Sequence, residues 1–141
     1  MLRLTEKFAA SIRAHGVETY PHECCGAILG RETDAAAREV RALVPLANRR
    51  DDSPRNRFEI TPDDVRVAEK KAWELGCDLI GWYHSHPDAP ARPSEFDREH
   101  AWPWYSYIIA SIEKAEPKAM NSWRLVDDRS HYDAEPIEIT G

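Results

Sequence analysis

A single mixed α/β domain is the fold class that the sequence predicts. Apolar runs typical of buried strands alternate along the chain with segments whose apolar residues recur at helical spacing. Apolar residues make up 42% of the 141 residues, enough for a core, while charged residues make up 31%, as on an ordinary protein surface. This length suits one domain, and no linker or internal repeat divides residues 1–141.

The first helix is expected near the start of the chain. Leu4, Phe8 and Ile12 recur every four residues, which is helical spacing. The pattern indicates a helix that begins near Thr5 and ends at Gly16, because glycine often ends a helix.

The clearest helix signal comes later. Thr61 is a suitable N-cap, and Pro62 fits the first helical position, where its missing N–H costs no hydrogen bond. Gly76 is placed to end this helix, and a third helix is expected from Ser94 to a point before Pro103. One apolar stripe of the second helix is expected to face the core: Val65, Ala68, Ala72 and Leu75.

Strands are expected where short apolar runs stand between turn residues. Residues 78–86 are predicted as a central strand and residues 135–139 as an edge strand. Residues 49–56 and 127–136 are predicted as polar loops. The other predicted strands are residues 24–30, 37–48, 57–60, 105–112 and 122–128.

Two histidines stand one residue apart at the end of the predicted central strand. Because side chains alternate between the faces of a strand, His84 and His86 should point the same way, with Ser85 opposite. Asp97 follows a proline-rich loop and lies one turn into the third predicted helix, from which it could fold back toward the histidines. Two imidazoles and a carboxylate suit a catalytic zinc ion, which leaves its fourth position to water.

The same residues also have an ordinary structural explanation. His-x-His pairs occur by chance and are then surface features rather than ligands. Ser94 and Asp97 have the spacing of a capping box, in which the side chains of the N-cap and of the third helical residue bond to each other's backbone N–H. The two explanations are compatible, and the pattern alone leaves both open.

A hydrolytic metal site also needs a group that takes a proton from water. Glu95 and Glu99 lie inside the motif, but both are typical of solvated helix residues. Glu23 stands directly before the buried strand at residues 24–30, where a solvated carboxylate is less expected. Spacing in the sequence does not by itself bring Glu23 beside His84.

These segments resemble a known family. The stretch GWYHSHP, with Ser94 and Asp97 after it, resembles the His-x-His-Pro-x(6)-Ser-x(2)-Asp signature of the JAMM/MPN+ (Mov34/MPN/PAD-1) zinc metalloproteases, in their compact bacterial and archaeal form. The stretch YPHECCGAILG resembles the upstream Pro-x-Glu-x-Cys-Gly segment of the same family, and RFEITPDD resembles the stretch that leads into the motif. The resemblance runs from about the first helix to SWRLVDD.

The resemblance implies a fold, a metal and a reaction. The implied fold is an α-β-α sandwich with a mixed central sheet, of the cytidine-deaminase-like type. It implies Zn²⁺ bound by His84, His86 and Asp97, with Glu23 as general acid/base and Ser94 as the hydroxyl that stabilises the oxyanion. Members hydrolyse peptide or isopeptide bonds after the C-terminal Gly-Gly of ubiquitin or ubiquitin-like proteins, and compact members also process sulfur-carrier proteins.

The expected partner is therefore a ubiquitin-like or sulfur-carrier protein that ends in Gly-Gly. The chain is too short for the long insertions with which larger members grip ubiquitin chains. A tail without side chains suits a groove that pairs with backbone, and residues 49–60 are the candidate sheet edge for it.

Three other functions fit the sequence less well. A zinc deaminase would need a Cys-x-x-Cys pair, which this sequence lacks. A thiol enzyme could be built on Cys25, but a cysteine in an apolar strand is usually a core residue. A catalytically silent MPN-type scaffold or binding module is the remaining alternative, and the complete set of ligand residues argues against it.

Composition limits the remaining partners and the compartment. The net charge of −6 argues against nucleic acid, because phosphate binding requires clustered Lys and Arg. No apolar run approaches the ~18 residues that span a bilayer, and the N-terminal segment lacks the apolar core of a secretory signal. The three cysteines form no disulfide framework, so a cytoplasmic protein is expected. The sequence does not predict the oligomeric state.

Overall fold

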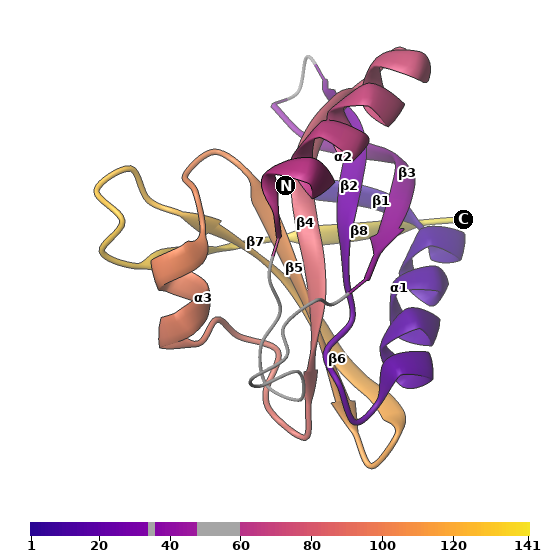
Figure 1. Ribbon diagram of the computed structural model, residues 1–141, viewed down its shortest axis with the longest axis vertical. Helices are drawn as coiled ribbons and strands as arrows, with labels where there is room; N and C mark the ends of the chain where they lie inside the picture. Colours follow the sequence, from indigo (N-terminus) through magenta and orange to yellow (C-terminus); the bar gives the residue numbers. More distant parts are fainter. Residues whose placement is uncertain (34–35, 48–59) are drawn as a thin grey trace.

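The computed structural model describes residues 1–33, 36–47 and 60–141, which form one curled sheet with helices packed against it (Figure 1). The helices of these residues are α1 Glu6–Thr19, α2 Pro62–Glu74 and α3 Glu95–His100. The strands are β1 Leu2–Thr5, β2 Cys25–Glu32, β3 Arg38–Leu46, β4 Asp78–Pro87, β5 Ser106–Glu113, β6 Glu116–Leu125, β7 Tyr132–Glu135 and β8 Ile137–Thr140.

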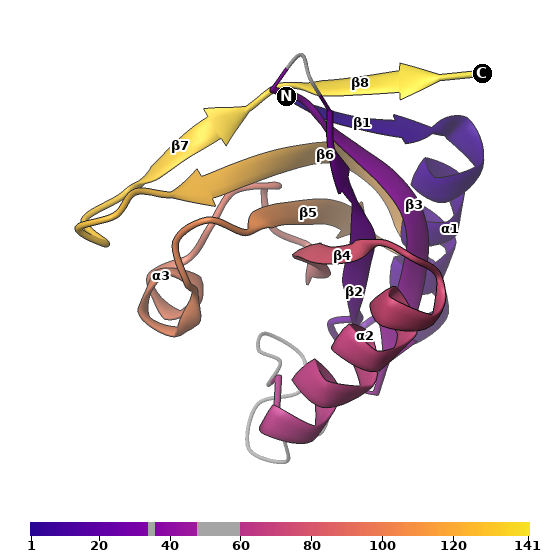
Figure 2. The same cartoon turned by 90° about the horizontal axis from the view of Figure 1, so that it is seen from above.

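The sheet is mixed and strongly curved. Its strand order is β7-β6-β5-β4-β2-β3-β1-β8. The strands pair in parallel at β4 with β5, at β1 with β3 and at β1 with β8, and the other neighbours are antiparallel. β7 and β8 end the strand order on opposite sides, yet they are consecutive in the chain. The sheet therefore curls until its two ends approach each other, as Figure 2 shows.

Two apolar cores cover the two faces of the sheet. The first packs Ile12 of α1 against Ile28, and the second packs Ala68 and Ala72 of α2 against Leu29. Successive residues of β2 thus enter opposite cores, which explains why this strand is an unbroken apolar run in the sequence. This arrangement confirms the predicted α-β-α sandwich with a mixed central sheet.

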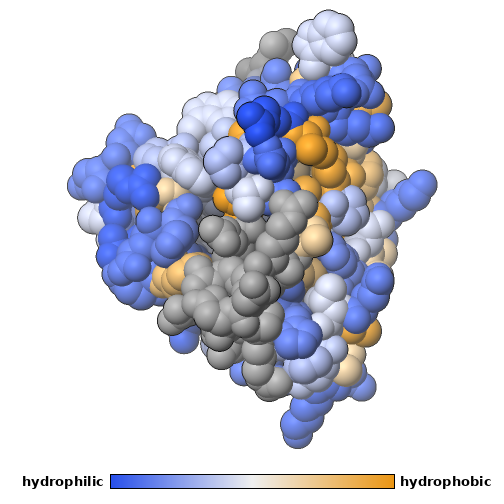
Figure 3. All heavy atoms as spheres, in the orientation of Figure 1, coloured by the Kyte–Doolittle hydropathy of each residue, from blue (hydrophilic) through white to orange (hydrophobic). Residues whose placement is uncertain are grey.

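The start of α2 confirms its predicted cap. The Thr61 side chain accepts a hydrogen bond from the backbone N–H of Asp64, and the Asp64 carboxylate accepts one from Thr61 N–H. Gly76 follows the end of the helix with a φ of +70°, a conformation that glycine adopts without strain. The predicted stripe was wrong at Leu75, which is the C-cap residue that follows α2 and is 51% exposed. The face seen in Figure 3 is mostly hydrophilic, with apolar residues gathered beside α2.

The N-terminal region differs from its prediction in two ways. Leu4 belongs to strand β1, where it pairs with Ile139 of β8, so its helical spacing from Phe8 was misleading. Gly16 does not end α1, which continues to Thr19. A Cβ atom at Gly16 would lie 2.9 Å from Ile112, so this glycine is explained by close packing of the helix on the sheet.

The C-terminal region also differs from its prediction. Residues 127–136, expected as a polar loop, include strand β7, which pairs with β6. The predicted edge strand at residues 135–139 is divided between the end of β7 and the start of β8. The predicted loop at residues 49–56 lies outside the described residues. So does the predicted strand at 57–60, except for Ile60, which is not in a strand.

The described part of the chain contains no helix with the length and apolar character needed to cross a membrane.

The pairing of β4 with β5 depends on Gly81. A Cβ atom at this position would collide with the Ser106 carbonyl oxygen on β5. We therefore expect Gly81→Ala to lower the free energy of unfolding by about 1–3 kcal/mol, measured by urea denaturation, because overpacking forces the strands apart. Gly76→Asn is the control, since that position has open space and a φ that Asn tolerates. Equal stability of Gly81→Ala and wild type would contradict this explanation.

Candidate metal centre

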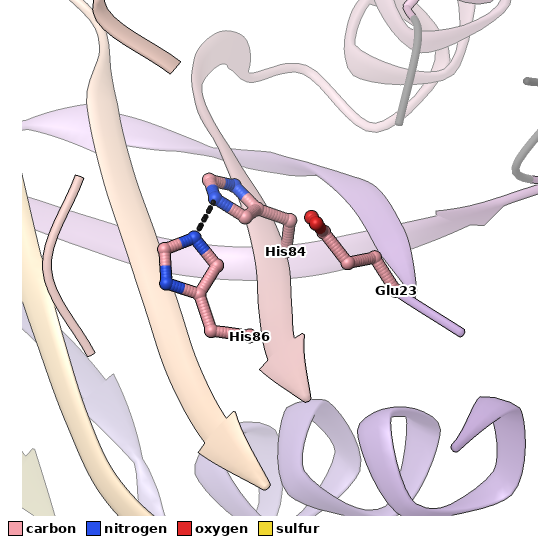
Figure 4. Close-up of side chains that lie close together, drawn as sticks. All are labelled: Glu23, His84 and His86. Carbon is pink, nitrogen blue, oxygen red and sulfur yellow. Dashed lines mark hydrogen bonds between the residues drawn. The ribbon is translucent and has the colours of Figure 1, made fainter. Parts of the chain in front are cut away.

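Two imidazoles meet at the end of β4. His84 Nε2 and His86 Nε2 lie 3.1 Å apart, and the residues are 1% and 8% exposed (Figure 4). Ser85 points to the other face, where its hydroxyl accepts a hydrogen bond from Cys24 N–H at 2.8 Å. The predicted alternation is therefore confirmed. β4 is paired on both sides, with β2 and β5, so the strand that carries the histidines is firmly held.

The carboxylate of Asp97 completes a triangle with the two imidazoles. Asp97 Oδ2 lies 3.3 Å from His84 Nε2 and 3.1 Å from His86 Nε2. The capping box is also present, because the Ser94 hydroxyl accepts from Asp97 N–H while Asp97 Oδ2 accepts from Ser94 N–H. The cap and the cluster thus use the same carboxylate oxygen, and the two explanations offered by the sequence hold together.

Burial and charge set the protonation of this triangle. Burial lowers the pKa of His84 below its ordinary value, against the opposing effect of Asp97, so its ring is neutral at pH 7. Burial alone would raise the pKa of Asp97, but His84 and the hydrogen bond from Ser94 N–H hold it below its usual range. A neutral imidazole and a carboxylate therefore face each other, and both can act as metal ligands.

The ring of His86 is oriented by the proline-rich loop. His86 Nδ1 lies 2.9 Å from the carbonyl oxygen of Pro90, which can only accept, so Nδ1 carries the hydrogen. In the neutral ring Nε2 then presents a lone pair to Asp97 Oδ2 and to His84. Metal-binding histidines commonly have such a partner on the other ring nitrogen.

The triangle fits a metal ion. Two ring nitrogens and a carboxylate oxygen converge within 3.1–3.3 Å of one another, so a cation between them could be bound by all three. A tetrahedral zinc site with bonds of ~2.0–2.2 Å has ligand atoms roughly 3.3–3.5 Å apart. The separations in the triangle are therefore close to those that such an ion requires.

The carboxylate of Glu23 reaches the same place from the segment just before β2. Glu23 is 2% exposed, and one of its oxygens lies within 4.8 Å of ring nitrogens of both histidines (Figure 4). Glu23, His84 and His86 together are able to hold a metal ion. The register explains this position: Cys25 pairs with His84, and Ser85 N–H donates to the Cys24 carbonyl, so Glu23 runs alongside His86.

Two hollows adjoin the cluster. A polar cleft contains Glu23, His86 and Ser94, and is bordered by the prolines of the following loop. On the other side, an apolar pocket between α3 and β5 contains His84 and Asp97. Its aromatic residues are Phe96, Trp102, Tyr107 and Tyr132.

Sequence reasoning missed two contributors to this site. Trp102 stands near the motif, where an aromatic residue is usually part of the core, but it is 46% exposed and lines the apolar pocket. Its place in a loop directly before Pro103 was the available signal. The carbonyl of Pro90 carries no signal of its own, because any residue has one. The neighbouring aromatic residues Trp82 and Tyr83, in β4, are buried in the core.

The loop after β4 is fixed through its carbonyl groups. Prolines cannot donate a backbone hydrogen bond, so a loop that contains several of them cannot form a regular ladder. Three successive carbonyls are instead bound by side chains: Ala89 by Ser111, Pro90 by His86, and Ala91 by both Asn121 and Trp123. Strands β5 and β6 thereby hold the loop that orients His86.

A family model described as prokaryotic homologs of the JAB domain matches residues 5–126. The chain belongs to this JAB-domain family. The match includes every residue of the cluster, and it confirms the resemblance drawn from the two sequence motifs.

Two curated relatives of this chain have names that describe an activity. A desampylase from Haloferax volcanii is 39% identical over 92 residues, which cover 64% of this chain and 63% of the relative. A probable TtuB-protein conjugate cleaving protease from Thermus thermophilus is 35% identical over 97 residues, which cover 69% of this chain and 61% of the relative. The chain thus spans less than two thirds of each relative.

A solved structure is similar over nearly the whole chain. The solution structure of a protein from Desulfitobacterium hafniense is 32% identical and covers 99% of this chain and 93% of its own, with a TM-score of 0.86. The curled sheet and its helices are therefore shared over nearly the whole of both chains.

The neutral state of His84 predicts how the metal-free protein responds to acid. The unfolded chain binds a proton at His84 near pH 6.5, whereas burial lowers the pKa of His84 in the folded chain, which therefore binds the proton only at lower pH. The stability that His84 contributes is therefore present above about pH 6.5 and is lost as the pH falls toward the lower folded pKa. In the presence of a chelator, the free energy of unfolding should fall by up to about 1.4 kcal/mol for each pH unit of acidification below about pH 6.5.

Two variants test this origin of the pH dependence. His84→Gln should flatten the slope between pH 6.5 and 5, measured by denaturant unfolding at each pH. His100→Gln, a change at an exposed residue of α3, should keep it. An unchanged slope in His84→Gln would show that other groups cause the acid sensitivity.

Proposed function

We propose that this protein is a zinc-dependent metallopeptidase that hydrolyses the peptide or isopeptide bond after the C-terminal Gly-Gly of a ubiquitin-like or sulfur-carrier protein. The observation that carries the proposal is the approach of the buried Glu23 carboxylate to the histidine pair. A cation site with a carboxylate beside it is what metal-assisted hydrolysis needs. The names of the desampylase and of the TtuB-conjugate protease support a ubiquitin-like substrate.

His84, His86 and Asp97 are the proposed metal ligands. A zinc ion bound there would act as a Lewis acid and bring the pKa of water toward ~7. The three side chains contribute two neutral nitrogens and one negative charge, so the site would keep a net positive charge that attracts a carbonyl oxygen. Pro90 holds His86 in the tautomer that leaves Nε2 available.

Glu23 is the proposed general acid/base. Its carboxylate takes a proton from the attacking water and returns it to the amine that leaves. Ser94 is proposed to donate a hydrogen bond to the oxyanion. Its oxygen already accepts from Asp97 N–H, so the hydroxyl hydrogen is directed elsewhere, and Ser94 shares the polar cleft with Glu23.

The substrate tail is proposed to enter through the polar cleft. Gly-Gly has no side chains, so it fits a narrow passage between backbone segments where larger residues would collide. The sheet edge proposed for strand addition, residues 49–60, lies outside the described residues except for Ile60, and it stays a prediction. Location in the cytoplasm also stays a prediction from the sequence.

The role of Glu23 can be tested by one substitution. Glu23→Gln should keep zinc but lose roughly 10²–10⁴-fold in kcat, because the amide cannot take the proton. The measurement is intact mass of ubiquitin-like proteins with tails beyond Gly-Gly, after incubation with the zinc-loaded enzyme. Glu95→Gln is the matched control, since Glu95 is an exposed residue of the same motif that binds Arg98. A fully active Glu23→Gln enzyme would refute the assignment.

The ligand set can be tested without any substrate. His86→Ala should lose bound zinc, measured by elemental analysis of the purified protein, because the remaining ligands leave the site open on one side. His100→Ala should bind zinc as wild type does, since His100 is exposed on α3. Retention of one zinc ion per chain by His86→Ala would show that the proposed ligands are wrong.

A further inference from the structure

We propose that the hydrogen bond between Tyr20 and Asp88 holds Glu23 at its working distance from the histidine pair. Tyr20 is then a positioning residue for proton transfer, and Asp88 is its anchor. The inference rests on the proposed function, in which Glu23 is the general acid/base.

The segment that carries Glu23 is tied to the histidine strand at two points. On one side, Cys24 N–H donates to the Ser85 hydroxyl at 2.8 Å, and Ser85 N–H donates to the Cys24 carbonyl at 3.2 Å. On the other side, the Tyr20 hydroxyl donates to Asp88 Oδ2 at 2.7 Å. Ser85 stands between the two histidines, and Asp88 follows His86 by two residues. The two attachments therefore lie on either side of Glu23 in the sequence, and both join its segment to the stretch that carries His84 and His86.

Tyr20 is itself fixed to the end of α1. It is the C-cap of that helix, and its N–H is shared between the carbonyls of Gly16 and Val17. The chain then turns through His22, whose N–H donates to the Thr19 carbonyl, and enters β2. Pro21 and His22 are exposed, so this turn gains little from core packing. A hydrogen bond of the Tyr20 side chain is therefore well placed to limit the movement of this turn.

Asp88 offers a rigid acceptor. Its φ is +54°, a left-handed conformation that Asp adopts more readily than most residues. Its N–H donates to the Ile112 carbonyl at 2.7 Å, and its Oδ1 accepts from Lys114 N–H at 2.9 Å. One carboxylate oxygen is thus held by the turn between β5 and β6, and the other faces Tyr20. In Figure 1 the end of β4, this turn and the connection from α1 to β2 meet at the lower end of the molecule.

The consequence concerns proton transfer more than metal binding. A general base works within hydrogen-bond reach of its proton, about 2.6–3.2 Å, and a displacement of ~1 Å can cost up to 10²-fold in rate. The proposed ligands lie on β4 and α3, so a shift of the Glu23 turn leaves them in place. Loss of the Tyr20 hydroxyl should therefore lower kcat while zinc binding and KM stay close to wild type.

The experiment is a double-mutant cycle read by enzyme kinetics. The substrate is a ubiquitin-like protein that carries an aminocoumarin amide after Gly-Gly. Tyr20→Phe should lower kcat by roughly tenfold, with one zinc ion retained and KM within about twofold. In a Glu23→Asp background, where the shorter carboxylate is already displaced, Tyr20→Phe should have less than about a twofold effect. Asp88→Asn should keep most of the activity, because the amide can still accept from Lys114 and bond to Tyr20.

Glu138→Gln is the control for lost stability. It weakens another exposed contact, the 2.9 Å bond from Arg3 Nε on the far edge of the sheet, and it should leave kcat unchanged. Equal multiplicative effects of Tyr20→Phe with and without Glu23→Asp would overturn the inference, as would a Tyr20→Phe enzyme that matches Glu138→Gln. If Glu23→Gln stays fully active, or wild type cleaves no substrate, the proposed function fails and takes this inference with it.

Discussion

The antiparallel pairing of β2 with β4 is the constraint on which the rest of the site depends. It places Cys25 opposite His84, so that the residues just before β2 run alongside the residues just after His84. Side chains two residues apart on a strand share a face, and Glu23 therefore meets the imidazole pair. A shift of one residue in this register would turn Glu23 to the opposite face and remove the proposed base from the cluster.

The Asp97 carboxylate serves the helix and the site at once. As the third residue of α3 it caps the helix through Ser94 N–H, and the same oxygen faces both histidines. The cap limits the rotation of the side chain, so the carboxylate is oriented before any metal arrives. A short helix after a proline-rich loop would be marginal alone, but strands β5 and β6 hold the loop through its carbonyls.

The two hollows beside the cluster divide the proposed chemistry between them. The polar cleft holds Glu23 and Ser94, the residues proposed to transfer the proton and stabilise the oxyanion, while the pocket lined by Trp102 is apolar and aromatic. Membership of the JAB family accounts for the fold that carries the cluster. In the proposed function, the surfaces around these hollows would contact the ubiquitin-like partner.

Local physics was enough to predict much of this protein from its sequence. Strand alternation put His84 and His86 on one face, and capping rules explained Thr61, Ser94 and Asp97, because each of these depends on neighbours within a few residues. Only the tertiary structure decided that Glu23 reaches the histidines, that Leu4 belongs to a strand, and that Gly16 is needed for close packing inside α1. Each of those outcomes depends on a partner far away in the chain, and spacing along the sequence carries no information about which distant strand will pair with which.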